Sequence, residues 1–150
     1  MAQHPTHPPA SPAPRARVPV LGAGWRFPVG LEAAVPPSRL AMSVDEESVR
    51  ESIYIILSTA KGERLMRPTF GCNLHELVFA VNNRATQATA AFEVREALEA
   101  WEPRIELLEV EASAGGDRGE QLLISIDYRV RSTDNRFNLV YPFYLDRPLA

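Results

Sequence analysis

The 150-residue sequence contains a single cysteine, Cys72, so no disulfide can form within the chain. It has no apolar run near the roughly 20 residues that a membrane-spanning helix needs. Its first residues are polar and proline-rich, without the apolar core of a secretion signal. The formal net charge of -3 lacks the basic excess of nucleic-acid-binding proteins. We therefore expect a protein of a reducing compartment, with no nucleic-acid partner and no direct membrane insertion.

Motifs that bind phosphate or metal are also scarce. Gly22-Ala23-Gly24 lacks the preceding strand and the third glycine of a dinucleotide-binding turn. Cys72 and His75 have the Cys-x-x-His spacing of half a zinc site, but no second pair completes it. We interpret them as a buried thiol and a surface imidazole, and we expect no metal and no cofactor.

Carboxylates are common enough to raise the question of a glycosidase. Such an enzyme needs two carboxyl groups that face each other across a sugar cleft. Most surface carboxylates are instead solvated or form local ion pairs. We expect no enzymatic activity, and a peptidoglycan hydrolase is the alternative hypothesis. The five candidates for an acid pair are Glu63, Glu76, Glu102, Asp127 and Asp134.

The composition divides the chain into two parts. Residues 1–20 hold six of the thirteen prolines, two arginines and no acid, so they are predicted to form a flexible, polyproline-like arm. The alternative is a basic arm that becomes ordered on a partner. Residues 21–150 have the apolar content of one folded domain.

The first half of this domain predicts a short strand at Leu40–Met42 and then a helix. Ser43 and Glu46 have the spacing of a capping box, with Ser43 as the N-cap. Gly62 suits the end of this helix, since a left-handed residue commonly follows a helix C-terminus. Pro68 predicts an extended segment before it, at 63–67. The apolar stripe of the helix is Val49, Ile53, Ile56 and Ala60.

The second half predicts a short helical turn near Leu74–Val78 and a long helix at Arg84–Trp101, which Pro103 must end. Three strands follow, at 105–110, 122–131 and 137–145, with turns at 113–120 and 132–135. Pro142 indicates that the last strand lies at an edge, because proline cannot donate to a ladder. The predicted fold class is α+β, with two main helices packed on a small, mainly antiparallel sheet that ends in a three-stranded meander.

Two clusters have the residue types of a binding surface. The first lies on the connection between the helices, where charge, glycine and an aromatic residue come together. The cluster comprises Gly62-Glu63-Arg64-Leu65-Met66-Arg67-Pro68 with Phe70-Gly71, and its predicted site residues are Gly62, Glu63, Arg64, Arg67 and Phe70. The second is Trp101-Glu102-Pro103-Arg104, where a stiff helix exit holds two opposite charges, and arginine can bind a carboxylate through two parallel hydrogen bonds. From these residues alone, a helix stop with a local ion pair is the simpler interpretation.

The ordered set of motifs resembles the gene-25-like baseplate wedge proteins of contractile tails, historically labelled lysozymes. The similarity runs over about residues 22–146. The segments that carry it are Gly24–Pro28, Val49–Leu57, Thr59–Arg64, Met66–Pro68, Phe70–Cys72, Leu77–Phe79, Trp101–Ile105 and Asn138–Phe143.

The resemblance implies a structural subunit of a contractile injection particle or phage-like tail. Members of the family occur in phage tails, type VI secretion systems and extracellular injection particles. Glu102, Pro103 and Arg104 would lie where wedge chains pack together, in a baseplate of expected six-fold symmetry. The family is also thought to initiate the sheath by exchanging strands, which would involve Leu139, Tyr141 and Phe143.

Implied partners are other wedge proteins and the sheath protein, with hub, spike or tube proteins as further candidates. The implied location is the cytoplasm during assembly and then the particle, which can be released from the cell. A generic adaptor domain unrelated to contractile tails is the remaining alternative.

Overall fold

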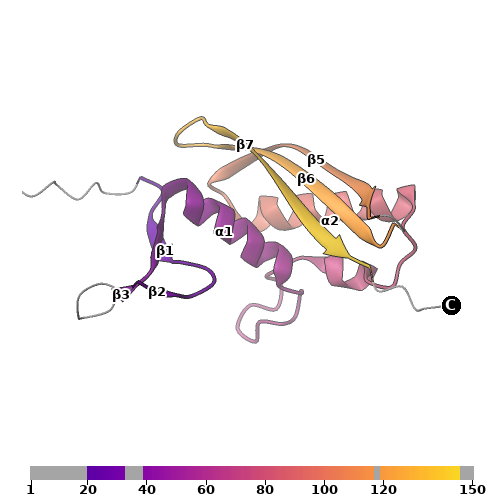
Figure 1. Cartoon of the computed structure of the whole chain (residues 1–150), viewed down its shortest axis with the longest axis horizontal. Coiled ribbons are helices and arrows are strands. Elements are labelled where there is room, and N and C mark those ends of the chain that lie inside the picture. Colours follow the sequence, from indigo (N-terminus) through magenta and orange to yellow (C-terminus); the bar gives the residue numbers. More distant parts are fainter. Residues whose placement is uncertain (1–19, 33–38, 117–118, 146–150) are drawn as a thin grey trace, which may run out of the picture.

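The computed structural model describes residues 20–32, 39–116 and 119–145. Apart from Val20, the proline-rich arm predicted at 1–20 lies outside the described residues. The elements, in chain order, are β1 (Ala23–Trp25), β2 (Leu31–Glu32), β3 (Arg39–Leu40), β4 (Met42–Val44), α1 (Asp45–Ser58), the 3-10 helix η1 (Asn73–Leu77), α2 (Arg84–Trp101), β5 (Ile105–Gly115), β6 (Gln121–Val130) and β7 (Arg136–Tyr144). The predicted α+β class is confirmed (Figure 1).

The C-terminal half forms the predicted three-stranded antiparallel meander, in the order β5-β6-β7. Every second residue of the central strand β6 is buried, as the alternation in the sequence predicts. Pro142 of β7 pairs with Leu123 of β6, and β7 has no further strand on its outer side among the described residues. The predicted edge position of Pro142 is therefore confirmed.

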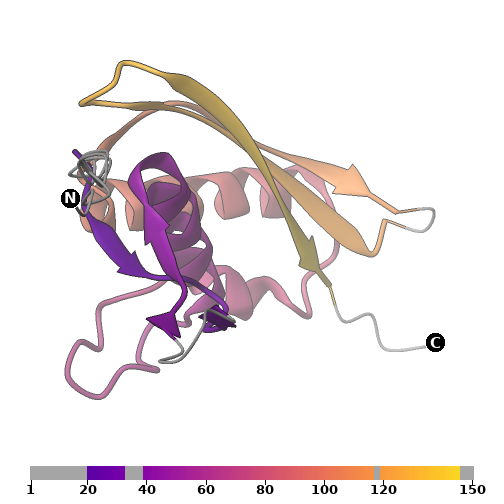
Figure 2. The ribbon, with the colours of Figure 1, turned by 60° about the vertical axis from the view of Figure 1, so that its left-hand side comes forward.

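The core lies between this sheet and the two helices, and Figure 2 shows the sheet passing over them. The helix α2 has the predicted bounds, and its Val94 and Leu98 are completely buried against the sheet. From α1, Val49, Ile53 and Ile56 are buried as predicted, whereas Ala60 lies beyond the helix. Neither described helix is long and apolar enough to cross a membrane.

The predicted capping box is wrong. Ser43 belongs to β4, opposite Gly24 of β1, so its backbone is extended and its hydroxyl points into the core without a hydrogen-bond partner. The strand pairing continues to Val44, and α1 begins only at Asp45. The Glu46 carboxylate does not turn back to Ser43 but accepts a hydrogen bond from the Asn135 side chain at 2.7 Å. Tertiary pairing here overrides a valid local signal.

Other differences concern the bounds and conformation of the predicted segments. The predicted strand at Leu40–Met42 divides into β3 and β4, interrupted at the buried Ala41. The segment 63–67 is not extended but folds into turns, because it closes on itself through backbone hydrogen bonds such as Gly62 N to Pro68 O, at 2.7 Å. The strand predicted to end at Val110 continues to Gly115, so the loop after it is shorter than predicted.

Gly71 marks the closest approach between the connection and α1. Its φ is +112°, and a Cβ atom there would lie 2.3 Å from the backbone oxygen of Thr59. The glycine is followed by Cys72, whose amide donates to the same Thr59 oxygen at 2.9 Å. Only glycine allows this contact, which brings the connection back against the end of α1.

We expect Gly71→Ala to lower the free energy of unfolding more than Gly62→Ala. Both glycines have positive φ, so both substitutions add conformational strain of about 1 kcal/mol. Only Gly71→Ala adds a clash with backbone, since nothing lies within 4 Å of a Cβ at Gly62. Urea denaturation of the two variants measures the difference, and equal losses would contradict the packing described for Gly71.

Candidate docking site

The Glu102-Pro103-Arg104 tripeptide forms a two-pronged ion pair. The Nε and Nη2 atoms of Arg104 donate to Oε1 and Oε2 of Glu102, each at 2.6 Å. The Glu102 side chain is 3% exposed and that of Arg104 is 30% exposed. Both carboxylate oxygens are occupied within the chain, so the pair is directed inward.

Local structure sets this geometry. The amide of Glu102 makes the last helical hydrogen bond of α2, to Leu98 O at 2.9 Å, and Pro103 prevents another turn. The chain then turns into β5, and the backbone of Arg104 accepts a hydrogen bond from Arg131 N at 2.9 Å. A proline between the two charges thus brings both side chains to the same side of the corner.

The guanidinium of Arg104 also contacts two distant parts of the chain. Its Nη2 donates to Ser52 Oγ on α1 at 2.8 Å, and its Nη1 to the Leu21 carbonyl at 3.4 Å. Hydrogen bonding to Glu102 raises the pKa of Arg104 above its usual value. One side chain therefore connects the end of α2, the middle of α1 and the segment before β1.

A cleft of about 290 Å³ opens beside this pair. Its walls come from α1, from the connection and from the end of α2. It is mostly apolar, and its single carboxylate, Glu102, is neutralised by Arg104. The lining residues are Ser52, Ile55, Ile56, Phe70, Trp101, Glu102, Pro103 and Arg104.

The connection reaches this cleft through a stack of three side chains. The guanidinium of Arg64 lies 3.9 Å from the centre of the Phe70 ring. The Phe70 ring in turn lies 5.2 Å from Trp101, between ring centroids. Cation–π and aromatic contacts of this kind are favourable beyond the area they bury. The structure therefore brings the two clusters singled out from the sequence into one surface, which we name the docking corner (residues 62–70 and 101–104).

The remaining members of the first cluster shape the loop. The Glu63 carboxylate accepts the amide of Ala60 at 3.0 Å, and Gly62 has the left-handed φ of +89° that its turn requires. Arg67 is exposed, and its backbone closes turns with Arg64 and Phe70. These residues hold the loop in shape, and Arg67 leaves a cation at its surface.

Two residues of the first cluster were not among its predicted site residues. Leu65 and Met66 are 97% and 94% exposed at the tip of the loop. The available signal was an apolar pair between two arginines on a connection, a place where solvent-facing residues are normally polar. Exposed apolar side chains of this size on an ordered loop are typical of a contact surface.

The predicted residues on β7 lie away from the docking corner. Leu139 and Phe143 are 5% and 7% exposed and belong to the core of this chain. Tyr141 packs edge-on against Tyr54 of α1, with ring centroids 5.3 Å apart. What β7 offers to a partner is therefore its outer backbone edge, together with its outward side chains such as Val140.

The residues considered for a zinc site and for an acid pair make other contacts in the structure. Burial raises the pKa of the Cys72 thiol, and the exposed His75 contacts the Ser58 carbonyl at 3.3 Å. In the described ranges, no three His, Cys, Asp or Glu side chains are grouped as a metal site requires. Of the candidate acids, Glu102 is bound to Arg104, while Asp127 lies on the sheet and accepts from Asn138 at 2.7 Å.

Because Glu102 is buried, we expect Arg104→Ala to destabilise the protein by about 3 kcal/mol, within the range for removing one member of a buried ion pair. The matched control is Arg129→Ala, which breaks more exposed pairs with Glu106 and Asp134 and should lower the stability much less. Chemical denaturation measures both. Similar losses would show that the Glu102–Arg104 pair does not brace the fold.

Several known proteins have related sequences or structures. Baseplate wedge protein gp25 of Enterobacteria phage T4 is 32% identical over 71 residues, which are 47% of this chain and 54% of that protein. The match thus spans about half the length of this relative. A crystal structure from Geobacter sulfurreducens, which carries the provisional name of a tail lysozyme, is 57% identical. It covers 72% of this chain and 97% of its own, with a TM-score of 0.66.

A subunit of the anti-feeding prophage baseplate shares the fold, with a TM-score of 0.60 over 84% of this chain and 87% of that chain, at 20% identity. The model of the family described as baseplate wedge protein gp25 matches residues 43–135. This range contains α1, the whole docking corner and most of the meander. The chain belongs to the family of the baseplate wedge protein gp25.

Proposed function

We propose that this chain is a structural wedge subunit of the baseplate in a contractile injection particle or phage-like tail, and that it binds neighbouring wedge chains through the docking corner. The observation that carries the proposal is a braced corner that presents an apolar tip to solvent. The buried Glu102–Arg104 pair fixes the base, and the Arg64–Phe70–Trp101 stack fixes the loop above it. A prearranged surface loses little conformational entropy on binding.

The chemistry of the corner favours a protein partner with an apolar side chain or helix. Burial of Leu65 and Met66 would contribute about 1.5–3 kcal/mol each. The cleft beside the Glu102–Arg104 pair is lined by Ile55, Phe70 and Pro103, which suit an apolar insertion from the partner. Arg67 remains exposed at the rim, where it can pair with a carboxylate on the neighbouring chain.

The second part of the proposal concerns the sheath. Among the described residues, β7 is the outer strand of the meander and offers a backbone edge that no described strand pairs with. Addition of a partner strand to such an edge uses main-chain hydrogen bonds. We propose that the first sheath subunits join here, so that the chain initiates sheath assembly by strand exchange. Several copies in a six-fold ring would then present several such edges. Assembly would take place in the cytoplasm, before any release of the particle.

A peptidoglycan hydrolase is the second candidate, because the Geobacter relative carries the name of a tail lysozyme. Glu109 of β5 and Asp127 of β6 are register partners in the sheet. Their carboxylates line one surface cleft, together with Arg136. Clearing of a cell-wall suspension by the purified chain, lost in Asp127→Asn, would establish this activity. Absence of clearing supports the structural role.

For the docking corner, we expect Leu65→Asp with Met66→Asp to abolish co-purification with the other wedge proteins of the same particle. The domain should remain folded, since both side chains are almost fully exposed. The matched control is Phe79→Asp with Val81→Asp, a pair of exposed apolar residues outside the corner. Equal wedge binding by both variants would refute the docking corner.

For the sheath contact, we expect Val140→Pro to leave wedge binding intact but to prevent sheath polymerisation. Alternate residues of a strand direct their backbone groups to the same side, so Val140 shares the orientation of Pro142. The substitution then removes an outward donor from the free edge and none from the ladder with β6. Electron microscopy measures the outcome, and particles with normal sheaths would contradict strand exchange at β7.

A further inference from the structure

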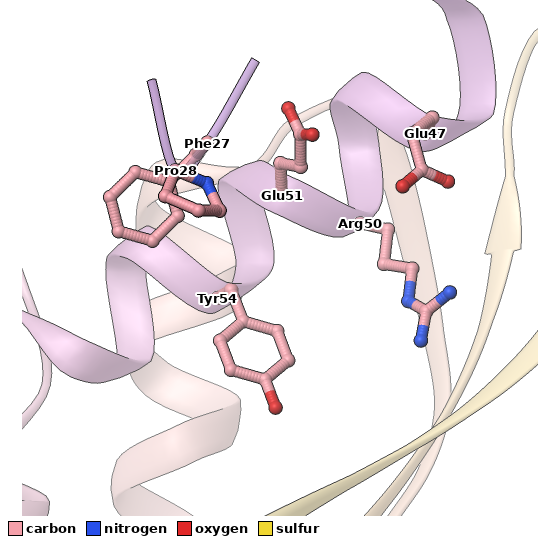
Figure 3. A pocket seen from close by; sticks show the side chains of 6 residues that line it. All are labelled: Phe27, Pro28, Glu47, Arg50, Glu51 and Tyr54. Atoms are coloured by element: carbon pink, nitrogen blue, oxygen red, sulfur yellow. The ribbon is translucent and has the colours of Figure 1, made fainter. Parts of the chain in front are cut away.

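A second cleft, separate from the docking corner, lies between α1 and the turn that follows β1 (Figure 3). Its volume is about 270 Å³. Phe27 and Tyr54 are 48% and 38% exposed there, so two aromatic rings face the solvent. Carboxylates from successive turns of α1 stand beside them. We name this cleft the α1 groove, and its lining residues are Phe27, Pro28, Glu47, Arg50, Glu51 and Tyr54.

The electrostatics of the α1 groove favour a basic occupant. The helix α1 contains four acids and the single base Arg50, which leave it at -3. Its first turn carries three of these acids. The groove lining itself holds the acids Glu47 and Glu51 and the base Arg50, a net charge of -1. Residues 1–19, in contrast, contain two arginines and no acid. The two segments therefore carry opposite charge.

The position at which residues 1–19 join the described chain lies at the same end of the helix. The amide of Leu21 donates to Asp45 Oδ1 at 3.2 Å. A polyproline helix rises by about 3.1 Å per residue, so Arg17 lies within about 9 Å of Val20 along such a chain. Glu51 is six residues beyond Asp45, a distance of about 9 Å along an α-helix. An arginine of the arm can therefore lie as far from Val20 as Glu51 lies from Asp45.

Proline spacing supplies the remaining complementarity. Pro5 and Pro8, and again Pro9 and Pro12, have the Pro-x-x-Pro spacing that places prolines on one face of a polyproline helix. Such segments bind grooves lined by aromatic side chains, and their conformation is preset, which lowers the entropic cost. The rings of Phe27 and Tyr54 and the ring of Pro28 provide a surface of this kind.

We propose that residues 1–19 occupy the α1 groove of their own chain, with their prolines on Phe27 and Tyr54 and with Arg15 and Arg17 facing Glu47 and Glu51. The segment would cover exposed apolar surface near the N-terminal strands and leave the docking corner free for wedge partners. This assignment is independent of the proposed baseplate function, because it concerns a different surface and an occupant from the same chain.

The full chain allows a direct test by paramagnetic relaxation. Ala13→Cys places a spin label in the arm, and native Cys72 stays unlabelled because it is completely buried. We expect the backbone amides of Glu47–Tyr54 and of Phe27 to lose intensity in the labelled protein. The double variant Arg15→Glu, Arg17→Glu should abolish this loss, as should high salt, which screens the charges.

Charge exchange provides the specificity control. Glu47→Lys with Glu51→Lys should also abolish the loss of intensity, and its combination with the reversed arm should restore it. The matched control, Glu109→Lys with Glu111→Lys, reverses two exposed acids on β5 and should change nothing. Thermal unfolding of each variant verifies that the domain is intact.

Three results would overturn the proposal. Uniform intensity across α1 would show that the groove is empty of the arm, and selective loss around Phe70 and Trp101 would place the arm at the docking corner. In a further sample, isotope-enriched chains without a spin label are mixed with spin-labelled chains. Loss of intensity in the isotope-enriched chains would then assign the groove to a neighbour's arm. Wedge co-purification by the arm variants is measured in parallel, so that failure here is distinguished from failure of the baseplate proposal.

Discussion

The buried pairing of Glu102 with Arg104 is the interaction on which the arrangement of this protein depends. It forms where α2 ends and β5 begins, and it extends through Ser52 to α1 and through Leu21 to the segment before β1. A carboxylate that is 3% exposed is tolerated only with a full set of partners, and Arg104 supplies both of its strong hydrogen bonds. The elements that meet at this point are therefore held at one relative position.

This constraint is compatible with the binding role proposed for the corner, although the charges of the pair face each other within the chain. A guanidinium that makes four hydrogen bonds within its own chain, two of them to a buried carboxylate, contributes little direct attraction to a partner. Its contribution is geometric, because it fixes Pro103, Trp101 and the cleft wall on which the loop rests. The apolar tip at Leu65 and Met66 then projects from a rigid base. The corner thus separates two tasks, with internal charges that set shape and external apolar groups that provide contact area.

The sequence was sufficient for the fold class, the bounds of α2, the alternation of β6 and the edge position of Pro142, since each follows from a local pattern or a backbone restriction. The sequence was insufficient to predict the conformation of Ser43. Its local capping pattern is present, but the pairing between β1 and β4 holds this residue in a strand. The direction of the Glu102 and Arg104 side chains also could not be predicted. A tripeptide fixes which charges are adjacent, whereas the direction of the Arg104 guanidinium depends on Ser52 and Leu21, which are distant in sequence.

The placement of exposed groups supports a division of the surface among different contacts. On β7, Leu139 and Phe143 are committed to the core, so a partner at this edge meets backbone groups together with side chains such as Val140. At the proposed docking corner a partner would meet apolar side chains and an arginine, whereas at the α1 groove the chain's own residues 1–19 would meet aromatic rings with carboxylates. Main-chain pairing tolerates a wide range of sequences, whereas the other two surfaces discriminate by shape and charge. In the proposed baseplate role, the subunit would gain specificity for its different contacts from surfaces that differ in this way.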